Sequence, residues 1–197
     1  MRRWRIDLAL AVGLMTAGSG ALAGDACGEF QPLSGTVAGM SLVDHTVFAD
    51  PGLGASISYS GDDGVLTYSR YDLGFDRISE RTLLLATERS LEEVSIAVLL
   101  LNGEIVRVRQ SGTRRLVNEV EVDDVVIVSR HGNGMQVDIL GIGTDGDCLH
   151  RVHYMPKMNG VGQDGRNGEG LLAFERFERA LDDLAVYFCR EGCLTEL

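Results

Sequence analysis

The side chains best suited to metal chemistry lie close together, because Cys148, His150 and His153 fall within six residues. Cysteine and histidine are common ligands of zinc and other transition metals. On a β-strand, however, successive side chains point to opposite faces, so Cys148 and His150 share a face while His153 points away. Nothing in the sequence brings His45 or His131 near them. We therefore expect structural or surface histidines and no metal site.

Carboxylates form a second candidate group, since Asp145, Asp147, Asp164 and Glu169 occur in glycine-rich turns. Calcium sites are often built from such carboxylates and nearby carbonyls, but the twelve-residue EF-hand order is absent. Asp and Gly also populate turns for conformational reasons alone. We interpret these residues as turn formers.

Motifs for cofactor binding or nucleophilic catalysis give no catalytic residue. Residues 141–146 match Gly-x-Gly-x-x-Gly, but a strand pattern follows where a dinucleotide site needs a helix, so a hairpin turn is expected. Gly-x-Ser-x-Gly and Ser-x-x-Lys are absent. The only lysine, Lys157, is expected to be a solvated charge. We expect no cofactor. The sequence favours a protein without enzymatic activity over an enzyme.

Four cysteines, Cys27, Cys148, Cys189 and Cys193, are expected to form two disulfides in an oxidising compartment. Zinc is the rival, but no Cys-x-x-Cys occurs. A strand over residues 148–155 extends about 26 Å and a helix over 171–188 about 27 Å. This match favours Cys148 with Cys189 and Cys27 with Cys193. The alternative pairs Cys189 with Cys193 and Cys27 with Cys148.

Residues 1–23 have the pattern of a signal peptide. Three arginines precede an apolar run over residues 8–17, and the small-residue triplet 21–23 ends the segment. Cleavage before Gly24 predicts a periplasmic or secreted protein. Cys27 lies too far from the triplet for a lipid anchor, and no apolar run reaches the roughly 18 residues of a membrane span.

Charge restricts the partners of the chain. The formal net charge is -11, and removal of residues 1–23 takes away three Arg and one Asp, which makes it -13. Nucleic acid and anionic membranes are disfavoured partners for such a chain. A protein partner remains possible.

The expected elements begin after an irregular N-terminal arm over residues 24–46, with a short strand near Phe30. A β-hairpin is predicted over residues 55–71 around the turn at 61–64. A helix is predicted over residues 80–101, N-capped by Ser79 and ended at 102–103. Residues 95–109 also fit two strands around the Asn-Gly turn, so that alternative stays open.

Beyond residue 104 the pattern is that of a meander followed by a final helix. A glycine-rich loop over residues 158–170 precedes the helix, whose apolar stripe runs over residues 171–188. The strands are expected near residues 105–108, 120–128, 135–144 and 148–155. Residues 47–197 then form one α+β domain, an antiparallel sheet of five to seven strands covered by two principal helices.

This element order resembles the PsbP/DcrB-like fold of small bacterial exported proteins. The residues that carry the resemblance are Ser56 to Tyr59, then Leu66 to Tyr68, and Tyr71 to Gly74. The resemblance implies export and an antiparallel sheet covered by helices. It implies no catalytic residues.

The sequence favours a non-enzymatic periplasmic binding or accessory protein that uses a surface patch. The first alternative is a hydrolase-type enzyme whose site is assembled from distant segments, indicated by a pocket that joins His150 or His131 to a carboxylate. The second is a module that binds a metal or a small ligand in the acidic turns.

Overall fold

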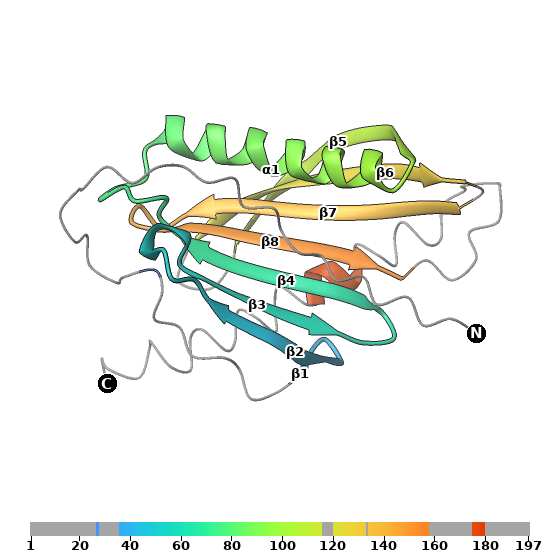
Figure 1. The fold of residues 1–197 in the computed structure, drawn as a ribbon, viewed down its shortest axis with the longest axis horizontal. Coiled ribbons are helices and arrows are strands. Elements are labelled where there is room, and N and C mark those ends of the chain that lie inside the picture. The colour runs from blue at the N-terminus through green and yellow to red at the C-terminus, as the bar shows by residue number, and fades with distance from the viewer. Residues whose placement is uncertain (1–26, 28–35, 116–119, 133, 158–174, 180–197) are drawn as a thin grey trace.

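The computed structural model describes residues 27, 36–115, 120–132, 134–157 and 175–179. Eight antiparallel strands form one curled sheet in the order β1-β2-β3-β4-β8-β7-β6-β5 (Figure 1). The strands are β1 Thr36–Val37, β2 Met40–Val47, β3 Ala55–Ser60, β4 Gly64–Tyr71, β5 Gly103–Arg115, β6 Glu121–His131, β7 Gly134–Thr144 and β8 Leu149–Pro156. The helical elements are the 3-10 turn η1 Pro51–Leu53 and the helix α1 Glu80–Leu100, and residues 175–179 are also helical.

Both faces of the sheet are covered in part. On one face, Val94 and Val98 of α1 pack against Val125 and Ile127 of β6. The opposite face carries a larger apolar cluster, and Phe177 from the helical residues 175–179 is buried in it. Alternate residues of β6 therefore face different cores, which explains the continuous apolar run over residues 125–128 of this strand.

The helix α1 begins and ends as its sequence predicts. The Ser79 side chain accepts a hydrogen bond from the backbone N–H of Thr82, which satisfies one of the free donors of the first turn. At the other end Asn102 adopts a positive φ of 54°, a left-handed conformation that stops the helix. The prediction of a helix is confirmed, and the alternative of two strands over residues 95–109 is wrong.

The two predicted β-regions are also confirmed. The first hairpin is β3–β4, paired from Ala55 with Arg70 to Ser60 with Val65. The later meander is β5–β6–β7–β8, and β8 pairs with β4, which closes the two regions into one sheet. Residues 141–144 lie in β7, which pairs with β8 from Ile139 with Tyr154 to Thr144 with Leu149, and Gly146 lies in the turn between the two strands. The glycine motif therefore belongs to a hairpin, as predicted.

The expected irregular arm differs from the structure, because residues 36–47 contain β1 and β2. Only Met40 of β2 is buried, and the pairing of β2 with β3 shifts register between Leu42 and Asp44. A strand of this kind lacks the alternating pattern that reveals strands in a sequence. It is specified by its pairing with β3. Phe30 lies outside the described residues.

The predicted fold class is wrong. The structure is mainly β, an eight-stranded curled sheet with α1 as its main described helix, so an α+β fold with two principal helices of the PsbP/DcrB-like kind is not supported. Of the expected final helix, only residues 175–179 are described. The hairpin that prompted the resemblance specifies a local structure that many sheets share.

The preferred disulfide pairing is wrong as well, because Cys27 is bonded to Cys148. Their Cα atoms are 5.8 Å apart and 121 residues separate them in the sequence. Equal lengths of strand and helix constrain a distance along one direction only, and do not select the cysteine that reaches Cys148. Cys189 and Cys193 lie outside the described residues, as do the predicted signal peptide and the loop over residues 158–170.

None of the described helices combines the length and the apolar composition needed to cross a membrane.

Candidate functional site

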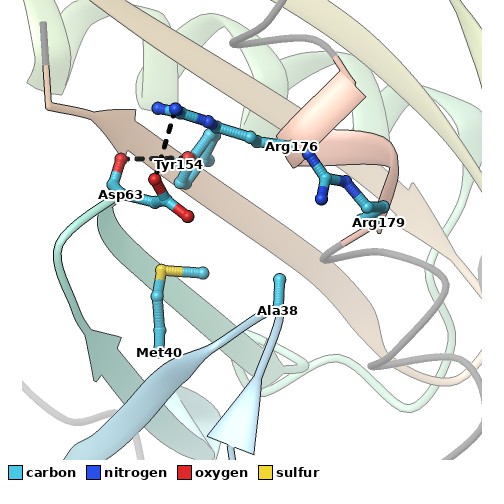
Figure 2. Close-up of a pocket in the computed structure, with 6 residues that line it drawn as sticks. All are labelled: Ala38, Met40, Asp63, Tyr154, Arg176 and Arg179. Carbon is cyan, nitrogen blue, oxygen red and sulfur yellow. Dashed lines mark hydrogen bonds and ion pairs between the residues drawn. The ribbon is translucent and has the colours of Figure 1, made fainter.

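A small pocket of about 110 Å³ opens where the β3–β4 turn, the end of β8 and the helical residues 175–179 meet (Figure 2). The β1–β2 hairpin supplies its apolar wall, and the helical residues supply two guanidinium groups. The lining residues are Ala38, Met40, Asp63, Tyr154, Arg176 and Arg179.

Phe177 fixes the two arginines relative to the sheet. Its side chain is fully buried, and its ring stacks on Tyr154 with centroids 6.2 Å apart and an interplanar angle of 17°. Residues three apart are neighbours on a helix surface, so Arg176 and Arg179 emerge side by side while Phe177 points into the core. One buried aromatic residue thereby positions both charges.

Arg176 is held by Asp63 of the β3–β4 turn. Its Nη2 lies 3.3 Å from Asp63 Oδ1 (Figure 2), and both side chains are partly exposed. An exposed ion pair of this kind contributes less than about 1 kcal/mol to stability. Its effect is to orient the Arg176 side chain along the pocket wall.

Tyr154 lines the pocket and acts as a hydrogen-bond donor there. Its hydroxyl donates to the Asp63 carbonyl at 3.2 Å. Burial raises the pKa of the Tyr154 phenol, and the nearby Arg176 and Arg179 offset this only in part. The phenol therefore stays protonated at neutral pH.

The β3–β4 turn is fixed by Lys157 at the end of β8. The Lys157 backbone N–H donates to the Asp63 carbonyl at 2.9 Å, and its Nζ donates to the Gly61 carbonyl at 2.9 Å. Gly64 has a φ of 152° and passes so close to Met155 that a Cβ would collide with the Met155 carbonyl. The only lysine therefore has a structural role beside the pocket.

Arg179 differs from Arg176 because its charge is not matched within the described part of the chain. Its Nε donates to the Glu175 carbonyl at 3.3 Å. Among the described residues no carboxylate lies within ion-pair distance of Arg179, and its side chain lines the pocket. This is the feature of the pocket best suited to binding an anion.

A second polar group surrounds His150, one of the residues singled out in the sequence. Tyr68 Oη lies 2.7 Å from His150 Nδ1, and His150 Nε2 lies 3.0 Å from Asp145 Oδ2. Arg70 Nη2 approaches the same carboxylate oxygen at 3.3 Å. With the neutral imidazole protonated on Nε2, the tyrosine donates to the histidine and the histidine donates to the aspartate.

Asp145 is the anchor of this group. Burial, the largest single influence, raises the pKa of its carboxyl, but hydrogen bonds from His150 and from the backbone N–H groups of Cys148 and Asp147 together hold that pKa well below its usual range. The two backbone bonds measure 2.6 Å and 3.0 Å. The ionised side chain thus closes the β7–β8 turn, as the turn interpretation predicts.

The order hydroxyl–imidazole–carboxylate is also that of a catalytic triad, but the surroundings differ. Tyr68 is 2% exposed, and burial raises the pKa of its phenol far above the ordinary value. A buried hydroxyl that holds its proton so firmly is a poor nucleophile. We interpret the Tyr68–His150–Asp145 group as a structural link between β4, β8 and the β7–β8 turn.

The remaining histidines are dispersed. His153 Nε2 lies 2.9 Å from Asp138 Oδ1, and His131 Nε2 lies 3.0 Å from Ser129 Oγ, while His45 lies on β2. His150 and His153 have separate partners on opposite faces of β8, as strand alternation predicts. In the part of the chain that the structure describes, no cluster of three or more His, Cys, Asp or Glu side chains could hold a metal ion. Asp164 and Glu169 lie outside it.

The sequence interpretation missed the arginine pocket. Arg176 and Arg179 fall in the expected helix over residues 171–188 and Asp63 falls in the expected turn at 61–64, and neither element was predicted to line a pocket. The available signal was two arginines three positions apart around a phenylalanine in a chain with a net charge of -11. That spacing indicates that the two arginines lie on the same face of a helix. Only the fold shows that Tyr154 and Asp63 line the same pocket.

Comparison of the chain with protein-family models, with curated proteins and with solved structures gave no match. The geometry of the pocket is therefore the basis for a functional proposal.

Proposed function

We propose that this chain is an exported, non-enzymatic binding protein that holds a carboxylate of a peptide or protein partner in the pocket beside Arg179. The observation that carries the proposal is the guanidinium of Arg179, which has no carboxylate partner among the described residues and lies at a pocket mouth. Planar guanidinium groups bind carboxylates through two parallel hydrogen bonds.

The size of the pocket limits the ligand. Pockets for whole small molecules usually enclose about 300–1,000 Å³, whereas this pocket encloses about 110 Å³. That volume suits one acidic side chain or a chain terminus. Met40 and Ala38 would contact its aliphatic part, and Arg179 its carboxylate.

The overall charge supports a partner with a single acidic group. A chain with a net charge of -11 repels polyanions at long range. One carboxylate that reaches the pocket instead experiences mainly the adjacent Arg179, because Asp63 already pairs with Arg176 and the bulk charge is screened beyond about 8–10 Å at physiological salt. Nucleic acid therefore remains a disfavoured ligand.

Export is part of the proposal. It is supported by the disulfide between Cys27 and Cys148, since such bonds persist mainly in oxidising compartments. The signal-peptide pattern of residues 1–23 supports it independently.

The hydrolase alternative is weaker. It is indicated by a pocket that joins His150 or His131 to a carboxylate. His150 does contact Asp145, but neither histidine lines the pocket beside Arg179. The second alternative, a metal or ligand site in the acidic turns, is opposed by Asp145, whose oxygens accept from its own turn, from His150 and from Arg70.

The proposal can be tested by NMR titration of isotope-labelled protein lacking residues 1–23. The probe is the peptide acetyl-Gly-Glu-Gly-amide, and acetyl-Gly-Gln-Gly-amide is its uncharged counterpart. We expect the acidic peptide alone to shift the Arg179 Nε–H and the backbone signals of Asp63 and Tyr154.

Arg179→Gln should abolish these shifts and leave the fold intact, because the side chain is exposed. Arg130→Gln is the matched control, since Arg130 is an exposed arginine of β6 that pairs with Glu104 at 3.6 Å, away from the pocket. Equal shifts with both peptides, or unchanged shifts in Arg179→Gln, would contradict the proposal.

A further inference from the structure

The outer face of α1 is apolar at both ends, although its side chains do not pack in the core. The inward side chains Val94 and Val98 make the contacts with the sheet. The outward side chains at the two ends are between 48% and 78% exposed. They are Leu84 and Leu85 near the start of the helix and Ile96, Leu99 and Leu100 near its end.

The last two turns of α1 carry no charge on any side. From Ser95 to Leu100 the helix has no Asp, Glu, Lys or Arg, and Leu101 beyond it is also exposed. A helix that is apolar all round is normally covered on all sides. The helical residues 175–179 do not cover it, because Phe177 packs in the cluster on the opposite face of the sheet.

The strand β5 extends this apolar surface. Val106 lies three residues after Gly103, about 10 Å along a strand, and Ile96 lies about 10 Å back along the helix from the same turn. The two residues are therefore at about the same distance from the turn that joins α1 to β5. Val106 and its neighbour Val108 are about half exposed.

The positions of the apolar side chains are symmetric about Glu92. Leu85 and Leu99 lie seven residues on either side of it, which is about two helical turns, so all three share one helix face. Leu84 and Leu100 lie eight residues on either side. If a second α1 packs antiparallel across a two-fold axis at Glu92, each apolar end of one helix meets the opposite apolar end of the other.

The outer face in the middle of the helix carries charges of both signs, because Glu88, Arg89 and Glu92 are all exposed. In this arrangement Glu92 of one subunit faces Glu92 of the partner subunit. Arg89 lies about one helical turn from Glu92 on the same helix, and so it also comes near Glu92 of the partner subunit. Arg89 is also 3.8 Å from Glu93 of its own helix, an exposed contact that leaves its side chain free to reorient. The two arginines offset part of the repulsion among the Glu88 and Glu92 carboxylates near the axis.

We propose that the outer face of α1 is the interface of a homodimer, in which two α1 helices pack antiparallel about a two-fold axis at Glu92. The exposed aliphatic side chains of α1, Leu101 and β5 amount to about 450 Å², taking roughly 100 Å² for each fully exposed side chain. That is more than half of the roughly 800 Å² that each subunit contributes to a standard interface. The edge strand β5 is a less suitable contact, because register shifts interrupt its pairing and Arg107 and Arg109 are exposed on it.

Sedimentation equilibrium of the protein lacking residues 1–23, over about 1–200 μM, tests the proposal. We expect a reversible dimer with a Kd in the micromolar range. Leu99→Arg should raise that Kd at least tenfold without lowering the Tm of the diluted protein, because Leu99 is exposed. Val43→Arg, an exposed aliphatic on β2, is the matched control and should leave the Kd unchanged.

A cysteine substitution tests the position of the axis. In a two-fold dimer only a residue on the axis faces its own copy, so Glu92→Cys should form an intermolecular disulfide on mild oxidation, whereas Arg81→Cys should not. A monomer at all concentrations, or a dimer that persists in Leu99→Arg, would overturn the proposal. So would equal cross-linking of both cysteine variants, or an α1 face that binds only a different protein. Arg179→Gln should not affect dimerisation, so the outcome is independent of the pocket.

Discussion

Removing the disulfide between Cys27 and Cys148 should destabilise the protein by about 5 kcal/mol. The bond joins residues separated by 121 positions, and closing a loop of that length in the unfolded chain reduces its entropy by about 16 cal/mol/K on the chain-entropy model. At 25 °C this corresponds to about 5 kcal/mol. Both cysteines are buried, so alanine at each position adds the smaller cost of lost packing.

The assay is urea unfolding of the double variant Cys27→Ala/Cys148→Ala followed by circular dichroism. With a slope of about 2 kcal/mol/M, the midpoint should fall by about 2–3 M. In thermal unfolding the Tm should fall by about 10–20 °C for a chain of this size. The control is Cys189→Ala/Cys193→Ala, in which the bond between Cys27 and Cys148 should still form.

Peptide mapping without reduction identifies the bond directly. The reasoning would be refuted by a peptide that links Cys148 to Cys189 in the unmodified protein. A loss of stability below about 1 kcal/mol in the Cys27→Ala/Cys148→Ala variant would refute the loop-closure estimate.

Two further substitutions test the packing and the polar network. Asp145→Ala should lower the free energy of unfolding at pH 7, measured with urea, by about 3 kcal/mol, because buried donors lose a charged acceptor. The control Asp147→Ala, at an exposed neighbouring position, should lower it by less than about 0.5 kcal/mol. The pKa of Asp145 is lowered in the folded state, so the ionised side chain stabilises the folded protein above the ordinary carboxyl pKa of 3.8, and this stabilisation is lost as the pH falls further. The free energies of unfolding of the unmodified protein and of Asp145→Ala should therefore converge in acid. A difference that grows in acid would contradict this. Phe177→Ala should lower the free energy of unfolding by about 3–5 kcal/mol. Phe75→Ala, which replaces a half-exposed phenylalanine, should lower it far less. Equal decreases would show that residues 175–179 do not pack on Tyr154.

The sequence determined those elements whose signals are local. The hairpin over residues 55–71 has turn residues between two alternating segments, and α1 has a capping serine, an apolar stripe and an Asn-Gly stop. The β7–β8 turn likewise followed from its glycines and Asp145. In each case the residues that specify the structure lie within about one turn or one strand of one another, so periodicity and turn chemistry were sufficient.

Tertiary structure alone decided how these elements meet. The strand β2 lacks an alternating pattern and exists because β3 pairs with it, and β4 pairs with β8 across about eighty residues of intervening chain. The same long-range contacts select Cys27 as the partner of Cys148 and bring Arg176 and Arg179 to the pocket that Tyr154 and Asp63 also line. Such contacts depend on the packing of surfaces that are distant in the sequence, and no local pattern encodes which surfaces those are.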